Sequence, residues 1–255
     1  MKNILSLCLF ALLGIFAASC NSSGKSQSAT TETAEETESA SSDNVLTKAE
    51  EEEGWKLLFD GKTTRGWRTF GKETAGSVWQ ADDGHLVFTP SREKGEGGDL
   101  ITEGQYENFH LKLDWNISDC GNSGVIFLIQ EENQEKTYHT GPEMQILDNT
   151  CHNDAQYPTH RAGSLYDLIQ AQPETENPAG EWNTAEIILD DGHLIFLLNG
   201  TQVVETQMFD ENWEEMIENS KFKSWPGFGT YRKGHIGLQD HGDVVRFRNI
   251  KIKEL

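Results

Sequence analysis

The clearest pattern in the chain is the alternation of apolar and polar residues over positions 109–117. Every odd-numbered residue of this stretch is large and apolar, and every even-numbered residue is polar or charged. Because successive side chains of a strand point to opposite faces of a sheet, this alternation predicts a strand with one buried face. Residues 124–130 are almost wholly apolar instead, which predicts a strand buried on both faces.

Asx-Gly pairs mark the turns between several of the remaining predicted strands. Asp83-Gly84, Asp191-Gly192 and Asn199-Gly200 each stand between two short apolar segments. Such pairs favour tight hairpin turns because both residues tolerate a positive φ. From these patterns, strands are predicted over residues 55–59, 78–81, 85–89, 109–117, 124–130, 143–147, 182–189, 193–198, 202–205, 234–239 and 244–252.

Helical pattern is scarce, with one short helix predicted over residues 212–220 and a turn over residues 166–169. Many short strands with few helices are typical of two antiparallel sheets packed face to face. We therefore expect an all-β sandwich with little helix. Residues 54–255, about 200 residues, suit a single domain of this class.

The first 20 residues are predicted to be a signal peptide with a lipobox rather than part of the fold. Lys2 gives a positive start, residues 4–16 are almost wholly apolar, and small residues at 17–19 precede Cys20. The apolar run is too short to span a bilayer, whose core needs roughly 20 residues. This arrangement predicts secretion, cleavage and lipidation at Cys20. The alternative is an ordinary signal peptide with an incidental cysteine.

Residues 21–53 are predicted to be a disordered acidic linker. They are rich in Ser, Thr, Ala and Glu, and they hold nine acidic and two basic residues. So few apolar side chains cannot offset the entropy of ordering the segment. The formal net charge of the whole chain is −21. Such a surface repels nucleic acids and anionic lipid headgroups, and it suits a neutral ligand such as a sugar, or a bound cation.

Two cysteines remain once the predicted signal and anchor are set aside. Cys8 leaves with the signal, so Cys120 and Cys151 belong to the domain. A secreted protein folds in an oxidising compartment, so a disulfide between them is expected. The alternative is a pair of buried free thiols.

Three clusters carry side chains that could do chemistry. In the strand predicted over 143–147, Glu143 and Gln145 share one face, which is either a binding surface or simply a solvated one. Gln239 and His241 have the same spacing in a glycine-bounded turn, where the histidine could transfer a proton, bind a metal or only bond the backbone. The third cluster is the long connection at 157–167, which is either a binding loop or a structural one.

Six short motifs together resemble one protein family. They are Leu58-Phe59-Asp60-Gly61-Lys62 with Gly66-Trp67, Gly121-Asn122-Ser123-Gly124, Glu143-Met144-Gln145-Ile146-Leu147-Asp148, Pro178-Ala179-Gly180-Glu181-Trp182-Asn183, Leu198-Asn199-Gly200, and Gly237-Leu238-Gln239-Asp240-His241-Gly242 with Val245-Arg246-Phe247-Arg248-Asn249-Ile250. In this order they resemble the 3-keto-disaccharide hydrolase domain family, and the resemblance covers residues 55–255. It implies a concanavalin-like jelly roll of a kind common in Bacteroidetes envelope lipoproteins.

The resemblance implies cleavage of glycosides whose sugar carries a ketone at C3. The ketone acidifies the hydrogen on C2, a base removes it, the C1 substituent leaves, and water can then add. Our hypothesis assigns Glu143 and His241 as the central pair, each as base or metal ligand, with His160 as the next candidate for proton transfer. A divalent metal ion could hold the ketone oxygen, and no organic cofactor is expected. The residues expected to bind the sugar are Asn122, Gln145, Arg161, Tyr166, Gln239 and Arg246.

Two other functions stay open at this point. A non-catalytic, lectin-like module would use the same sandwich to bind unmodified sugar and would release no product. An ordinary retaining or inverting glycosidase would need a second carboxylate beside Glu143, for which Asp148, Asp167 and Asp240 are the candidates. In each case we expect a protein of the cell envelope, anchored to the outer membrane and facing the periplasm or the surface.

Overall fold

The computed structural model describes residues 43–93 and 95–255. The predicted signal peptide, the lipidation site at Cys20 and linker residues 21–42 lie outside the described residues. Within the described residues, no helix is both long and apolar enough to cross a membrane.

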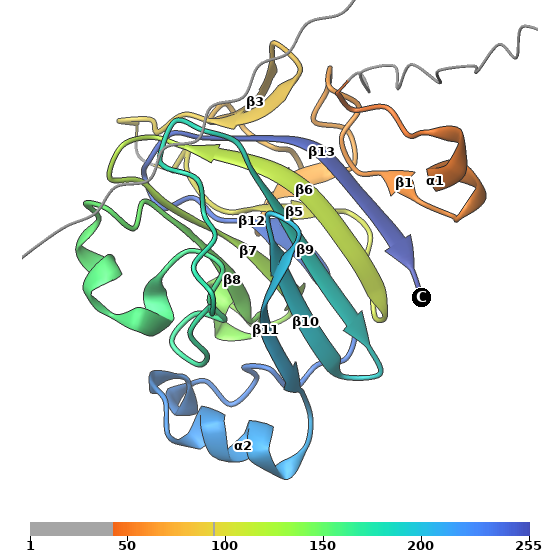
Figure 1. Cartoon of the computed structure of the whole chain (residues 1–255). Helices are drawn as coiled ribbons and strands as arrows, with labels where there is room; N and C mark the ends of the chain where they lie inside the picture. Colours follow the sequence, from red (N-terminus) through yellow and green to blue (C-terminus); the bar gives the residue numbers. More distant parts are fainter. Residues whose placement is uncertain (1–42, 94) are drawn as a thin grey trace, which may run out of the picture. The chain divides into compact units, whose positions relative to one another are not determined.

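Two antiparallel sheets make up the domain, as expected from the strand patterns (Figure 1). The larger sheet has the order β11 (Thr201–Gln207), β10 (His193–Leu198), β9 (Asn183–Asp190), β6 (Phe109–Ile117), β13 (Val245–Glu254), β4 (His85–Phe88) and β3 (Trp79–Asp82), with β1 (Lys56–Leu57) paired to β13. The smaller sheet has the order β2 (Trp67–Thr69), β5 (Leu100–Thr102), β12 (His235–Leu238), β7 (Asn122–Ile129) and β8 (Glu143–Leu147).

The core lies between the sheets, where the two predicted burial patterns meet. β6 alternates strictly between buried and half-buried residues, and β7 is buried along its whole length. Val125 and Phe127 of β7 join the large core cluster, while Ile126 and Ile129 belong to a second cluster on the opposite face. The predicted all-β sandwich of two antiparallel sheets is therefore confirmed.

All three predicted hairpin turns are present. Asp83-Gly84 joins β3 to β4, Asp191-Gly192 joins β9 to β10, and Asn199-Gly200 joins β10 to β11. All six residues have positive φ, between 45° and 82°. This geometry is that of the tight turn whose twist matches paired strands.

The structure corrects the predicted linker at its C-terminal end. Residues 43–53, expected to be disordered, include the helix α1 (Lys48–Glu52), which Thr47 caps with a reciprocal hydrogen bond to Glu50. Asn44 is buried, its backbone N–H donates to the side-chain oxygen of Asn249 in β13, and its own side-chain oxygen accepts from the backbone N–H of Asn249. Sequence composition missed this because long-range pairing with β13, rather than local hydrophobicity, holds the segment.

Two irregular excursions flank the smaller sheet. The first, after β8, holds the 3-10 turns η2 (Asn153–Gln156) and η3 (Pro158–His160), and the predicted disulfide Cys120–Cys151 fastens it to the chain just before β7. The second, between β11 and β12, contains α2 (Glu211–Glu218), close to the helix predicted there, and η4 (Lys221–Ser224). A further 3-10 turn, η1 (Thr137–His139), precedes β8.

Candidate active site

A cavity of about 340 Å³ lies on the face of the smaller sheet that points away from the larger sheet. Met144 and Ile146 of β8 belong to the core cluster, so Glu143 and Gln145, of opposite parity, face the cavity. The residues that line the cavity are Asn122, Tyr138, Gly141, Glu143, Gln145, Tyr166, Lys221, Phe222, Trp225, Phe228, Gln239 and His241.

The floor of the cavity consists of acceptor groups without partners in the protein. Asn122 from β7, Gln145 from β8 and Gln239 after β12 each have a buried side-chain oxygen that makes no hydrogen bond within the described residues. Buried polar atoms usually have partners, because desolvation without a hydrogen bond costs about 1–3 kcal/mol. Three such oxygens around one cavity indicate a ligand that donates several hydrogen bonds.

Glu143 is buried among these amides, with 7% of its surface exposed. Burial raises the pKa of its carboxyl to about 8, the negative charge of Asp99 adds to the rise, and the Lys221 ammonium partly offsets it. Gly124 of β7 makes room for the carboxyl, because a Cβ at residue 124 would lie 1.8 Å from the Glu143 Oε1. A group with a pKa close to neutral pH can both take up and release a proton.

The opposite wall of the cavity is aromatic. Tyr138 from η1 and Phe222, Trp225 and Phe228 from the second excursion line it. The Trp225 ring centroid is 5.4 Å from that of Tyr138 and 5.7 Å from that of Phe222, and Phe222 stacks on Phe228 at 3.8 Å. A polar floor facing aromatic rings suits a sugar, whose hydroxyls hydrogen-bond at the edge while its C–H face packs on the rings.

Tyr166 and Lys221 close one side of the cavity. The Lys221 Nζ lies 4.0 Å from the centroid of the Tyr166 ring, a cation–π contact. Burial, together with the negative charges of Asp154 and Glu143, raises the pKa of the Tyr166 phenol. Tyr166 therefore keeps its proton and can donate a hydrogen bond, while Lys221 supplies a positive charge beside Glu143.

A second cavity of about 440 Å³ adjoins the first, and the two share Tyr138, Gln239 and His241 as lining residues. His241 is exposed. Because it lines both cavities, it lies where they meet. The second cavity is bordered by Phe70, Gly95, Gly97, Gly98, Asp99, Glu135, Lys136, Thr137 and Asp240.

Backbone contacts hold the turn that carries His241. Asp240 accepts hydrogen bonds from the backbone N–H groups of Gly98, at 2.7 Å, and Gly242, at 3.0 Å. Its own N–H donates to Asp99 at 2.9 Å. Asp99 is half-buried, and desolvation raises the pKa of its carboxyl, which accepts a hydrogen bond from the Thr137 hydroxyl. These contacts fix His241 at the junction between the cavities.

Six of the residues predicted from the sequence line the first cavity together: Asn122, Glu143, Gln145, Tyr166, Gln239 and His241. His160, Arg161 and Arg246 do not line either cavity. The roles of the six in binding or catalysis stay predictions.

His160 lies behind the cavity wall. Its ring is 4.4 Å from that of Tyr166, and its Nε2 is 2.8 Å from the Asp167 carboxylate. Arg161 fastens the first excursion by donating to the Ala155 carbonyl and to Glu174.

Arg246 is exposed on β13, between two buried residues, and therefore points out of the larger sheet. The sequence could not separate these three from the cavity residues because loop folding and sheet assignment are tertiary properties.

The carboxylates considered as partners for Glu143 have other contacts. Asp148 accepts hydrogen bonds from Thr150 and from the Cys120 N–H, and Asp167 pairs with His160. Neither lines a cavity, and Asp240, which lines the second one, holds the turn described above. This arrangement does not favour the two-carboxylate glycosidase.

Two groups of three potential metal ligands come together within the described residues. In the group Cys120, Asp148 and Cys151, the cysteines form the disulfide, so no thiolate is available. The second group is His152, His241 and Asp243. Glu143 belongs to neither group, so the predicted metal pair Glu143 and His241 lacks a third histidine, cysteine or carboxylate ligand among the described residues.

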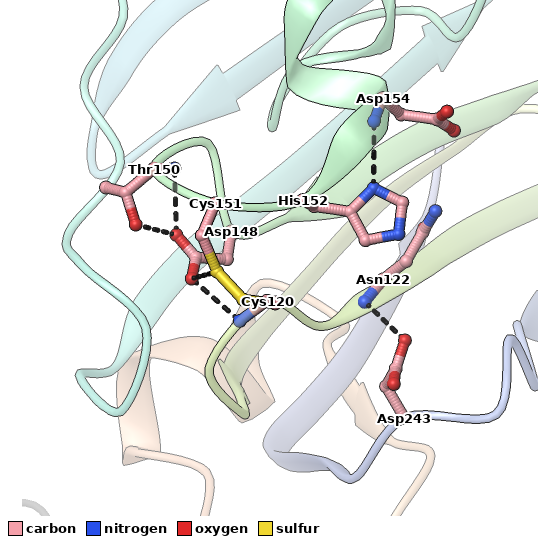
Figure 2. Close-up of a disulfide and its surroundings, with 8 residues drawn as sticks. All are labelled: Cys120, Asn122, Asp148, Thr150, Cys151, His152, Asp154 and Asp243. Carbon is pink, nitrogen blue, oxygen red and sulfur yellow. Dashed lines mark hydrogen bonds between the residues drawn. A yellow bond between two sulfur atoms is a disulfide. The ribbon is translucent and has the colours of Figure 1, made fainter.

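The protonation of His152 does not fit a three-ligand metal site. Its Nδ1 accepts a hydrogen bond from the backbone N–H of Asp154 at 3.1 Å (Figure 2). The proton of the neutral ring is therefore on Nε2, which leaves that nitrogen without a lone pair for a metal. Metal-binding histidines normally donate from their second nitrogen rather than accept there. These three side chains therefore do not fit a metal ion.

Several cavity residues escaped the sequence analysis, namely Tyr138, Lys221, Phe222, Trp225, Phe228 and, beside the cavity, His152. A signal for most of them existed. Residues 221–231 contain four aromatic residues within an irregular, Gly- and Pro-containing stretch. Aromatic residues in such a loop often serve binding rather than the core.

The chain matches the family model of the 3-keto-alpha-glucoside-1,2-lyase-like domain over residues 54–253. A 3-keto-disaccharide hydrolase of Bacteroides thetaiotaomicron is 38% identical to the chain over 229 residues. The match covers 80% of this chain and 79% of that protein.

Two crystal structures of proposed glycosyl hydrolases from Parabacteroides distasonis have a similar fold. The first is 33% identical with a TM-score of 0.78, and the match covers 84% of this chain and 100% of that one. The second is 28% identical with a TM-score of 0.60, with coverages of 79% and 99%.

Proposed function

The chain belongs to the 3-keto-alpha-glucoside-1,2-lyase-like domain family, and on this premise we propose that it cleaves glycosides whose sugar carries a ketone at C3. The relative from Bacteroides thetaiotaomicron, named for hydrolysis of 3-keto-disaccharides, supports a glycoside-cleaving enzyme. The observation that carries the proposal is the first cavity, in which Glu143 and three unpartnered amide oxygens face an aromatic wall.

The keto sugar occupies the first cavity in this proposal. Its hydroxyls donate to the oxygens of Asn122, Gln145 and Gln239, and one face of its ring packs on Trp225 and its aromatic neighbours. The leaving group then extends past His241 into the second cavity, because His241 lines both. The bond between C1 and the leaving-group oxygen thus lies near His241.

Glu143 is the base that removes the proton from C2. Burial makes its carboxylate a stronger base than an exposed one, since its pKa is raised to about 8. The C2–H electrons move toward the ketone, and the Lys221 ammonium and the Tyr166 phenol, which line the same cavity, stabilise the developing enolate. The C1–O bond then breaks, and His241 protonates the leaving oxygen.

Hydration of the unsaturated product completes a net hydrolysis. Water adds its oxygen to C1 and gives a proton to His241, while the proton held by Glu143 returns to C2, so both the base and the acid are regenerated. Release before hydration would give the elimination product instead. Both outcomes need the same base and the same acid.

We also propose that the protein acts in the cell envelope as a lipoprotein anchored through Cys20, on the observation that small residues and an apolar run precede this cysteine. Metabolic labelling with a fatty acid analogue tests this proposal. Label that persists in the Cys20→Ser protein would contradict it.

The chain lacking its first 20 residues, incubated with 4-nitrophenyl 3-keto-glucoside and with the unoxidised glucoside, tests the enzymatic proposal. We expect nitrophenol only from the keto compound, with a loss of at least about 100-fold in Glu143→Gln and in His241→Ala, as is typical for acid and base groups. Arg246→Ala, exposed on the other sheet, is the matched control and should keep the parental rate.

The same assay separates the alternatives. Sugar binding without release from either compound would favour the lectin-like module. Release from the unoxidised glucoside would favour an ordinary glycosidase. A chelator that abolishes cleavage, with recovery on adding a divalent metal, would support the predicted metal pair of Glu143 and His241.

A further inference from the structure

His152 has a fixed hydrogen-bonding role at one end of its ring. It follows Cys151 of the disulfide directly and caps η2, where its Nδ1 accepts the Asp154 N–H. In a charged imidazole Nδ1 also carries a proton, which would point at the Asp154 N–H instead of accepting from it. The cap therefore favours the neutral ring with its proton on Nε2. Figure 2 shows Nε2 on the side of the ring that faces Asn122 and Asp243.

Three polar atoms surround one point beside the cavity. The ligand atoms of His152, His241 and Asp243 all lie within 4.8 Å of one another. An oxygen atom placed between them is then within about 2.8 Å of each, which is hydrogen-bonding distance. Asp243 is held in place by the backbone N–H of Asn122, at 3.1 Å.

The three groups match the bonding capacity of a hydroxyl. A hydroxyl donates once and accepts twice. Here it would donate to the Asp243 carboxylate and accept from the His152 Nε2–H and from an N–H of His241. A metal ion would need a lone pair from His152 that its cap does not leave.

We propose that His152, His241 and Asp243 form a binding site for one hydroxyl oxygen, with His152 as its fixed donor. The proposal rests on the proposed function, since His241 and Asn122 both line the cavity assigned to the sugar. The oxygen belongs either to a hydroxyl of the substrate or to the water that adds to C1.

Two substitutions separate the two ends of the His152 ring. Asn in His152→Asn can still cap η2 through its side-chain oxygen but lacks the distant N–H. Gln in His152→Gln can place an amide N–H near the Nε2 position but lacks the short cap. A site for a hydroxyl predicts that His152→Asn loses function and that His152→Gln recovers part of it, whereas a purely structural cap predicts the reverse.

The measurements are kcat and KM for 4-nitrophenyl 3-keto-glucoside, the products formed, the Tm, and calorimetric binding of the unoxidised glucoside. If the oxygen is a substrate hydroxyl, His152→Asn should raise KM and weaken glucoside binding on the order of tenfold, about the effect of one lost hydrogen bond. If it is water, KM and binding should stay unchanged while the unsaturated product accumulates.

The proposal is overturned if His152→Asn matches the parent in KM, products and binding, or if His152→Gln alone loses activity together with Tm. The binding arm does not depend on turnover. A parent chain that binds glucoside but cleaves no keto compound would therefore remove the proposed function and the water that adds to C1 with it, and glucoside binding by the two variants would still decide whether this site binds a sugar hydroxyl.

Discussion

At the residue scale, Glu143 is an ionisable side chain in a buried position, and its burial makes the stability of the fold depend on pH. Its pKa is about 8 in the folded chain and 4.5 as the ordinary value. The unfolded chain thus releases the proton as the pH rises past 4.5, while the folded chain keeps it until about pH 8. Stability from this residue is fully present below pH 4.5, falls as the pH rises from 4.5, and is completely lost once the pH has passed 8.

Glu143→Gln should therefore raise the free energy of unfolding at pH 7, by at most about 3 kcal/mol. The gain in Tm should shrink toward pH 4, where Glu143 is neutral in both states. Glu186→Gln is a control of opposite sign, because hydrogen bonds from His110 and Lys112 lower the pKa of Glu186 to about 2. Thermal melts of both variants between pH 4 and pH 8 check this.

Gly124 offers a steric test of the same carboxyl. In Gly124→Ala the new Cβ would meet the Glu143 side chain, so the carboxyl must move. We expect a fall in kcat of at least about tenfold, since a displacement of one ångström in a catalytic group can cost that much or more. Adding Glu143→Ala should recover Tm but not kcat, because it removes the side-chain atoms that meet the new Cβ and removes the base with them. Unchanged kcat in Gly124→Ala would contradict the assigned position.

At the scale of elements, the aromatic wall depends on the second excursion being anchored. The indole N–H of Trp213 in α2 donates to the Gly229 carbonyl, and the Gly229 N–H donates to the Thr140 carbonyl beside η1. These bonds connect the two segments that carry Trp225 and Tyr138. The wall is therefore part of the folded framework of the domain.

Trp225→Ala should weaken binding of the glucoside by about tenfold, because a stacked ring contributes roughly 1 kcal/mol or more beyond the contact area lost. The rate constant kcat should change less, since Trp225 contacts no reacting atom. Calorimetry and steady-state kinetics measure the two quantities. Tyr231→Ala is the matched control, because Tyr231 belongs to the same excursion, is 38% exposed and lines neither cavity. Equal binding by the two variants would remove the wall from the sugar site.

Elements with a local signature were predictable from the sequence. β6 follows from its alternation, and the three hairpins follow from their Asx-Gly pairs. β2 and β5 have three residues each, too few to show a period, whereas β1 lies within the strand predicted over residues 55–59. The family resemblance, taken from six short motifs, is confirmed by the family match, and five of the cavity residues lie in those motifs. The aromatic residues of 221–231 indicated a binding loop, but the position of the aromatic wall and the role proposed for His152 depend on how two irregular excursions fold.

At the scale of the whole domain, the disulfide Cys120–Cys151 links the excursion carrying His152 to the start of β7, which carries Asn122. It closes a loop with a sequence separation of 31 residues, for which loop entropy predicts a stabilisation of about 3–4 kcal/mol. Replacing both cysteines by serine should lower Tm and also weaken glucoside binding. A fall in Tm with unchanged binding would show that the excursion keeps its position without the bond.

Residues 43–53 lie on the larger sheet, whereas the cavity lies on the smaller one. Besides the Asn44–Asn249 pair, Asp43 accepts a hydrogen bond from Arg248 at 2.9 Å, and Glu50 pairs with Lys251. All three partners belong to β13, the strand paired with β6, β4 and β1. Removing residues 43–53 should therefore lower the stability of the fold without changing the cavity that is proposed to bind the sugar.

A chain that begins at Gly54, where the family match begins, should melt at a lower temperature than a chain that begins at Asp43. Its KM and glucoside affinity should equal those of the longer chain below the melting range. Asn44→Ala in the longer chain should reproduce part of the loss, about 1–3 kcal/mol. It removes a buried side-chain amide that accepts from the Asn249 N–H and donates to the Gly84 carbonyl. Equal Tm for the two chains would mean that the segment rests on β13 without stabilising it, and an altered KM would mean that the two sheets are coupled through β13.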